Sequence, residues 1–183
     1  MDNSLFAGNA FTVVNFWFNG CKPCVEELDD LNALNEKVKA QGGEVIGINT
    51  ETLDGNQQGI DAAKKLLETT GASYRNIYFA SGSEAGKFAL NIMAFPTTYV
   101  FDRDGNVVGQ PLLGGIDKEE NLAALQKNID AALAKDNANV QRMTNESAGE
   151  NAYTIFDTDE HLDSSTIEAL KQIPSMYRVR VIK

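Results

Sequence analysis

The chain has 183 residues, enough for one large domain or for an ordinary domain plus a small second unit. Its formal net charge of -10 disfavours nucleic-acid and anionic-membrane partners, because both need clustered Lys and Arg. No run approaches the roughly 18 consecutive apolar residues of a membrane span, and residues 1–10 lack a signal-peptide pattern, so we expect no exporting or anchoring segment in the chain as written.

The first part of the chain alternates between predicted strands and helices. Residues 11–18 are almost all β-branched or aromatic, which predicts a central strand buried on both faces, and Asn19-Gly20 ends it. Apolar residues at helical spacing then predict a helix that begins near Pro23 and closes at Gly42-Gly43; they are Val25, Leu28, Leu31, Leu34 and Val38. A second buried strand over residues 44–49 completes a βαβ unit.

The same pattern continues to about residue 133. Residues 60–69 predict a helix that ends at Gly71, residues 74–79 a third strand, and residues 83–90 a short helix. Two further strands, 97–102 and 107–110, form a hairpin joined through Asp104-Gly105, and residues 118–133 form an amphipathic helix. We therefore expect an α/β domain with a central mixed sheet flanked by helices.

A smaller α+β segment is predicted to follow, with a domain boundary that gives residues 1–135 and 136–183. Residues 140–144 and 152–157 are predicted to be strands around a polar turn at 145–149, residues 164–172 a helix and residues 177–182 a last strand. Because residues 177–182 alternate between polar and apolar side chains, we expect one face of that strand to be solvated.

The two cysteines, Cys21 and Cys24, stand where the first strand turns into a helix. A thiolate is the attacking species in disulfide exchange, and the unpaired N–H groups of a helix start stabilise that anion. One helical turn brings Cys24 under Cys21, so Cys24 can resolve a mixed disulfide formed on Cys21. The arrangement predicts a redox site with Cys21 as the exposed nucleophile and Cys24 as the more buried resolving residue.

Three alternatives to a redox pair are weaker. A zinc site needs four ligands, and the only histidine, His161, lies in a distant segment and is expected to be a solvated loop residue. An inert structural disulfide across so few residues would remove little chain entropy. Two unrelated buried thiols would not account for the position between strand and helix. We expect no metal and no cofactor.

Residues 14–27, which contain the cysteine pair, and residues 94–105 resemble two motifs of the thioredoxin-like TlpA/ResA family of bacterial thiol-disulfide oxidoreductases. The resemblance covers roughly residues 4–135 and implies a thioredoxin-like fold. It implies a cis Pro96 facing the cysteines, with the Phe95 backbone open to pairing by a substrate strand. Phe95, Pro96 and Trp17 are then the expected substrate contacts.

The resemblance also makes Glu27 a third candidate catalytic residue. Glu27 matches the family's acidic residue three positions after the second cysteine, where it could relay a proton to Cys24. The plainer alternative is an acidic residue that only complements the helix dipole.

Three positions distinguish the chain from related groups. Gly20 replaces the family's common tryptophan, which reduces the apolar docking surface, and Asn15 replaces the buried aspartate of thioredoxins proper. Phe18 stands where peroxiredoxins carry a threonine, which disfavours peroxidase chemistry.

The last 45 or so residues resemble the end of the ACT regulatory domain of D-3-phosphoglycerate dehydrogenases, in residues 139–149, 152–157 and 167–182. The pattern lacks that domain's first strand and its ligand-contacting loop, so serine sensing is not carried over. A piece without its first strand would expose an edge and an apolar face. It could pack on the helix at residues 118–133 or on a second copy of itself, and a fusion joined near Lys135 is a further alternative.

We expect the protein to exchange disulfides with protein substrates, with an upstream thiol reductant as its other partner. Pro23 between the cysteines and the family resemblance favour the reducing direction. The alternative is a ligand-binding or assembly module in which the ACT-like tail dominates and the cysteine pair is vestigial. The resemblance implies work outside the bacterial cytoplasm, whereas the chain as written, without a signal, implies the cytoplasm.

Overall fold

The structure is a computed structural model that describes residues 5–136, 140–148, 151–158, 167, 170–171 and 178–181. It divides into two compact units, Met1–Asp136 and Asn137–Lys183, and each is described by itself.

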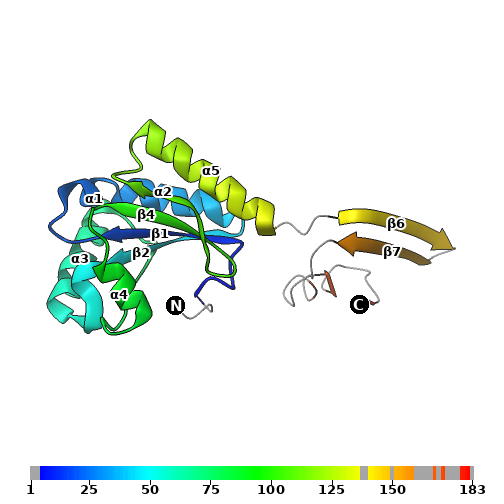
Figure 1. The fold of residues 1–183 in the computed structure, drawn as a ribbon, viewed down its shortest axis with the longest axis horizontal. Helices are drawn as coiled ribbons and strands as arrows, with labels where there is room; N and C mark the ends of the chain where they lie inside the picture. The colour runs from blue at the N-terminus through cyan, green and yellow to red at the C-terminus, as the bar shows by residue number, and fades with distance from the viewer. Residues whose placement is uncertain are drawn as a thin grey trace. The chain divides into compact units, whose positions relative to one another are not determined.

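The first unit contains a mixed five-stranded sheet in the order β3-β2-β1-β4-β5. Figure 1 labels its middle strands, β2, β1 and β4. Its central strand, β1, pairs in parallel with β2 and antiparallel with β4. The outer strands β3 and β5 pair with β2 and β4. The strands are β1 (Phe11–Trp17), β2 (Gly43–Asn49), β3 (Arg75–Ile77), β4 (Thr97–Asp102) and β5 (Val107–Leu113).

Helices cover both faces of this sheet, because alternate side chains of β1 pack against different helices. Phe11, Val13 and Trp17 pack in one cluster with residues of α1, α2, α3 and α5, whereas Val14 and Phe16 pack in a second cluster with α4. The helices are α1 (Lys22–Glu26), α2 (Leu28–Lys39), α3 (Gln57–Thr70), α4 (Glu84–Leu90) and α5 (Glu119–Asp136), with a 3-10 segment, η2 (Thr50–Gly55). The predicted α/β architecture is confirmed.

Turn residues end the elements where the sequence predicts. Gly71 ends α3 in the left-handed conformation with φ 71°, which glycine adopts without a steric cost. The β4–β5 turn is held by Asp102, whose Oδ1 accepts hydrogen bonds from the backbone N–H groups of Asp104 and Asn106 at 3.2 and 2.8 Å. Gly105 provides the positive φ of 80° that this turn needs.

Three elements of the first unit differ from the prediction. The single helix expected from Pro23 to Val38 is two helices, α1 and α2, separated at Glu27. The third strand shrinks to the three residues of β3, and β5 continues through Pro111 to Leu113. Because β5 is an edge strand of the sheet, a proline without an N–H is tolerated there.

The described part of the second unit contains an antiparallel pair, β6 (Val140–Ala148) and β7 (Asn151–Thr158). The expectation of a turn at residues 145–149 is wrong at 145–148, because the pairing continues to Ala148 opposite Asn151. Residues 178–181 lie in no strand, so the predicted last strand is absent there. Residues 167, 170 and 171 are helical, whereas His161 and the remainder of these two predicted elements lie outside the described residues.

Candidate redox-active site

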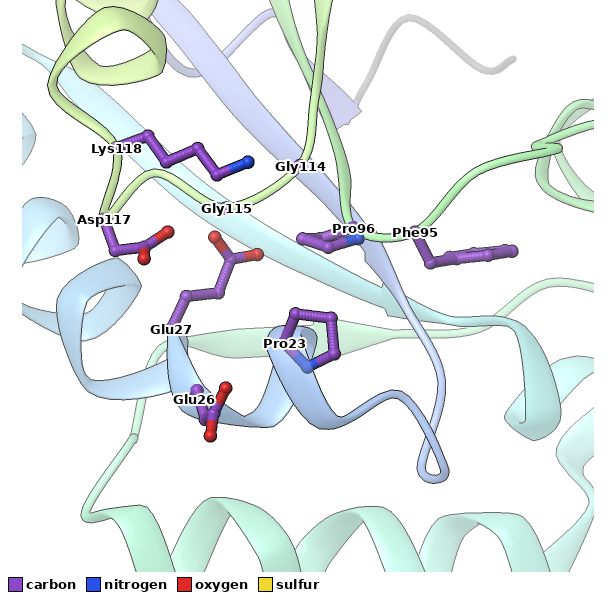
Figure 2. A pocket seen from close by; sticks show the side chains of 9 residues that line it. All are labelled: Pro23, Glu26, Glu27, Phe95, Pro96, Gly114, Gly115, Asp117 and Lys118. Atoms are coloured by element: carbon purple, nitrogen blue, oxygen red, sulfur yellow. The ribbon is translucent and has the colours of Figure 1, made fainter.

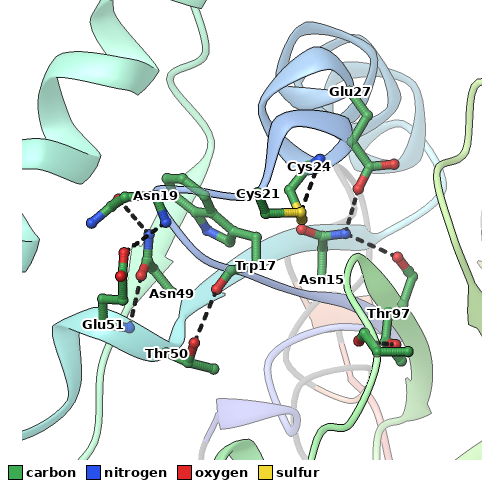
Figure 3. The surroundings of a disulfide bond; sticks show 12 residues. Asn15, Trp17, Asn19, Cys21, Cys24, Glu27, Asn49, Thr50, Glu51 and Thr97 are labelled. Atoms are coloured by element: carbon green, nitrogen blue, oxygen red, sulfur yellow. Dashed lines mark hydrogen bonds between the residues drawn. A yellow bond between two sulfur atoms is a disulfide. The ribbon is translucent and has the colours of Figure 1, made fainter.

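The two cysteines form a disulfide bond at the start of α1 (Figure 3). Cys21 is the N-cap residue of α1, and its Sγ accepts a hydrogen bond from the backbone N–H of Cys24 at 3.3 Å. Pro23 occupies the first turn, where a missing N–H leaves no hydrogen bond unmade. Cys21 retains 5% of its surface and Cys24 none, so Cys21 is the more accessible of the two sulfurs.

The loop that enters α1 is anchored to the end of β2. The backbone N–H of Asn19 donates to Oε2 of Glu51 at 2.8 Å, and Nδ2 of Asn49 donates to Oδ1 of Asn19 at 2.8 Å (Figure 3). Oδ1 of Asn49 in turn accepts from the backbone N–H of Glu51 at 2.9 Å. These bonds fix the chain two residues before Cys21, which limits the positions that its sulfur can take.

Glu27 is a buried carboxylic acid at the junction of α1 and α2, with 1% of its surface exposed. Oε1 accepts from Nδ2 of Asn15 at 2.9 Å, and Oε2 accepts from the backbone N–H of Ile116 at 2.8 Å. Burial removes the Glu27 carboxylate from water and raises its pKa from 4.5 to about 7. The two hydrogen bonds favour the anion, but they only partly offset this loss of hydration. Asp117 and Asp30 raise this pKa further by charge repulsion.

Asn15 links this acid to the sheet beneath the cysteines. It lies in the middle of β1, fully buried, and its Nδ2 also donates to Oγ1 of Thr98 at 3.0 Å. In Figure 3 the Asn15 amide is drawn between the Glu27 carboxylate and the cysteine pair. This amide in the middle of a buried strand is thus part of the site.

The loop that contains Pro96 borders the site on the other side. The Phe95–Pro96 peptide bond is cis, the isomer that the family resemblance implies. The Phe95 ring packs edge-on against Phe18, with ring centroids 5.2 Å apart, and the Pro96 carbonyl accepts from the backbone N–H of Gly114 at 2.9 Å. Phe95 thereby packs against the cluster that contains both cysteines.

A cleft of about 310 Å³ opens between the start of α1 and the Pro96 loop (Figure 2). Pro23 and Pro96 face each other across it, and the Glu27 carboxylate points into it from below. Its other lining residues are Glu26, Phe95, Gly114, Gly115, Asp117 and Lys118. The cleft thus joins the buried acid to Pro23, the residue between the two cysteines, and to the Pro96 loop.

The structure gives Trp17 a role different from the expected one. Its side chain is fully buried, and its indole N–H donates to Oδ1 of Asn76 at 3.0 Å. A substrate cannot contact a side chain that has no exposed surface, so the expectation that Trp17 contacts substrate is corrected. Trp17 packs in the core beneath the cysteines instead.

Sequence reasoning missed two partners of Glu27. The backbone N–H of Ile116 and the side chain of Asp117 come from a loop almost ninety residues later in the chain, and no local pattern connects that loop to α1. Asn15, by contrast, carried a signal, because a polar residue within a buried strand needs a partner. Within the residues that the structure describes, no group of three or more His, Cys, Asp or Glu side chains could hold a metal ion.

The strand order and the disulfide at a helix start place the fold in the thioredoxin-like class. One solved structure with the same fold is a protein from Chlorobium tepidum assigned provisionally as a thiol:disulfide interchange protein DsbE, with 26% identity and a TM-score of 0.56 over 71% of this chain and 84% of that one. Another is a secreted Mycobacterium tuberculosis disulfide oxidoreductase homologous to E. coli DsbE, with 18% identity and a TM-score of 0.51 over 72% of this chain and 87% of that one.

Residues 2–110 match the family model described as the AhpC/TSA family, and the chain belongs to that family. A relative named thiol-disulfide oxidoreductase ResA from Bacillus thuringiensis (strain Al Hakam) is 29% identical over 114 residues, which are 62% of this chain and 61% of that protein. The chain therefore spans less than two thirds of that relative. The family match ends at residue 110, so it does not bear on the ACT-like resemblance of the tail.

Proposed function

We propose that the chain is a thiol-disulfide oxidoreductase that exchanges its Cys21–Cys24 dithiol with disulfides in proteins. The observation that carries this proposal is a disulfide between residues one helical turn apart, one of which caps the helix. Membership of the AhpC/TSA family and the names of the ResA relatives support it.

Cys21 is the nucleophile in this proposal. As the N-cap residue, its sulfur lies at the positive end of the helix dipole, and it accepts the Cys24 N–H at 3.3 Å. Both effects stabilise a thiolate relative to a thiol. The Cys21 thiolate attacks one sulfur of a substrate disulfide, which forms a mixed disulfide and releases the other substrate sulfur as a thiolate.

Cys24 completes the exchange. Its thiol loses a proton, the thiolate attacks the Cys21 sulfur, and the second substrate sulfur leaves; the substrate gains two electrons and the protein dithiol loses them. We propose that Glu27 takes up this proton. Its position at the end of α1, three residues after Cys24, and its pKa of about 7 suit a base that must bind and release a proton near neutral pH.

The substrate contacts in this proposal are Phe95 and Pro96. They lie at the cleft beside α1, and the Phe95 ring is held by Phe18 rather than left free to move over the sulfurs. A substrate strand could pair with the backbone of Phe95 while its cysteine approaches Cys21. The partners would then be protein disulfides or dithiols.

We propose that the protein acts as a reductant, with an upstream thiol donor that restores its dithiol. Pro23 between the cysteines and the likeness to ResA proteins support this direction. Reduction potentials of such sites range from about -270 to -120 mV, so a titration against glutathione buffers measures the direction. A potential close to that of DsbA would overturn it.

Reduction of insulin disulfides in the presence of dithiothreitol tests the activity. The wild-type protein should accelerate insulin precipitation, and Cys21→Ser should abolish the acceleration. Incubated with insulin without dithiothreitol, reduced Cys24→Ser should instead trap a mixed disulfide through Cys21, because the resolving thiol is missing. An equal rate for the wild type and Cys21→Ser would exclude the proposed chemistry.

The second unit is proposed to pair with a second copy of itself. Its described strands β6 and β7 form a two-stranded sheet, and such a pair is marginal in water without a further strand or a packed face. Light scattering across protein concentrations measures the oligomeric state, and a single species at monomer mass would exclude dimerisation.

A further inference from the structure

Asn15 has one polar atom that the oxidised protein leaves without a partner. Its Nδ2 makes two hydrogen bonds, to Oε1 of Glu27 at 2.9 Å and to Oγ1 of Thr98 at 3.0 Å. Its Oδ1 is buried and accepts none. A buried carbonyl oxygen without a hydrogen-bond donor is destabilising, so such atoms are rare in folded proteins and each one needs a physical explanation.

The position of Asn15 on β1 places this oxygen below the cysteines. Strand side chains alternate between faces, and Phe11, Val13 and Trp17, which share a face with Asn15, pack in the cluster that contains Cys21 and Cys24. Figure 3 shows the Asn15 oxygen turned toward the cysteine pair and its nitrogen toward Glu27. An ionised Glu27 carboxylate only accepts hydrogen bonds, so it fixes the amide in this orientation.

The disulfide offers no donor to this oxygen. Sulfur atoms joined to each other carry no hydrogen, so Cys21 and Cys24 can offer nothing to Oδ1 in the oxidised state. Two electrons and two protons from an external dithiol, which itself becomes a disulfide, break the bond and give each cysteine a thiol. Cys21 can release its proton to solvent, whereas the fully buried Cys24 retains an S–H group.

We propose that Oδ1 of Asn15 accepts a hydrogen bond from the Cys24 thiol once the disulfide is opened, which makes Asn15 a positioning residue selective for the reduced state. The inference rests on the proposed thiol-disulfide exchange. The bond holds the Cys24 thiol beside the Asn15 amide, which also binds Glu27. The Cys24 thiol, which gives up the proton, and the Glu27 carboxylate, which takes it up, are therefore held by the same side chain. It also stabilises the dithiol relative to the disulfide.

The first test observes the hydrogen bond directly. In a Cys21→Ser background Cys24 is the only thiol of the chain, so its S–H stretching band in the infrared is unambiguous. Adding Asn15→Ala should move this band to higher frequency, because the acceptor is lost. Adding Asn15→Asp, which retains an oxygen at the same place, should keep the band at low frequency.

The second test measures the equilibrium of the cysteine pair with glutathione. A hydrogen bond made only in the reduced state stabilises the dithiol, so Asn15→Ala should favour the disulfide by about two- to twelvefold. Tenfold corresponds to about 30 mV toward a more negative potential for this two-electron couple. Asn35→Ala is the matched control, because Asn35 is also buried but binds the backbone N–H of Val45 on β2.

The outcomes separate the inference from the function on which it rests. Unchanged S–H frequency in Asn15→Ala, or an equal shift of the potential in Asn35→Ala, overturns the hydrogen bond even if the wild type reduces insulin. If the wild type does not reduce insulin but Asn15→Ala still moves the S–H band, the proposed function fails and the hydrogen bond stands. The expected result is a shift of both readouts in Asn15→Ala alone.

Discussion

Glu27 makes the stability of the protein depend on pH in an unusual direction. The pKa of this acid is about 7 in the folded protein and 4.5 in the reference state, so between these values the folded state holds a proton that the unfolded state has lost. The stabilisation is therefore complete below the lower pKa and is lost as pH rises through about 7. Most buried carboxylates that accept hydrogen bonds behave in the opposite way, because their pKa is lowered.

Replacing Glu27 with Gln should remove this dependence. At about 1.4 kcal/mol per pKa unit, the oxidised wild-type protein should lose on the order of 3 kcal/mol of unfolding free energy between about pH 5 and about pH 8 relative to Glu27→Gln. Urea unfolding at both pH values measures the difference. Glu26→Gln is the control, because Glu26 is exposed and should retain the wild-type profile. Parallel profiles for Glu27→Gln and the wild type would show that Glu27 does not carry the effect.

The residue types of the site could be predicted, but their connections could not. The cysteines stand at a strand-to-helix junction that the sequence pattern predicts, whereas the place of Pro96 facing them is what the family resemblance implies. The bond from Ile116 to Glu27 joins segments that are distant in sequence, and a backbone donor has no signature in the side chains. Trp17 was expected to contact substrate from the family resemblance, although a strand predicted to be buried on both faces leaves its side chain in the core.

At the scale of elements, the break between α1 and α2 shows what periodicity cannot detect. The apolar positions Val25, Leu28 and Leu31 continue through the break with helical spacing, so the pattern alone predicts one helix. Glu27 nevertheless serves as the C-cap of α1 and the N-cap of α2, with φ -97° and ψ 0°. Its side chain meanwhile accepts hydrogen bonds from two other elements, which local sequence does not encode.

Helix ends, by contrast, are encoded locally, and α3 gives a direct test. Gly71→Ala should destabilise the protein by about 1 kcal/mol, because φ 71° is costly for a residue with a Cβ although no atom lies within 4 Å of the added carbon. Gly82→Ala is the matched control, since its Cβ also meets nothing within 4 Å and its φ is not positive. Thermal or urea unfolding compares the two, and equal stability of both variants would contradict the conformational origin of the effect.

At the scale of the whole molecule, the first unit builds its own core around the sheet. The final helix α5 packs on β4 and β5, and Leu125, Ile129 and Ala132 on its inner face are buried in the cluster that contains the cysteines. Within the part of the chain that the structure describes, no helix is both long and apolar enough to cross a bilayer. The redox site and the core that supports it thus belong to one unit.

A protein that ends at residue 136 should therefore fold and retain the redox activity. Every residue that holds the disulfide, Glu27 and the Pro96 loop lies before the boundary between Asp136 and Asn137. We expect the truncated protein to unfold cooperatively, and to reduce insulin within about twofold of the full-length rate because small surface effects are usually below about 0.5 kcal/mol. The comparison also decides between the two functions that the sequence allows. If the truncated protein folds but loses its redox activity, the tail contributes to the site. If it folds and remains active, the cysteine pair is functional without the tail, which excludes the alternative of a ligand-binding or assembly module with a vestigial cysteine pair.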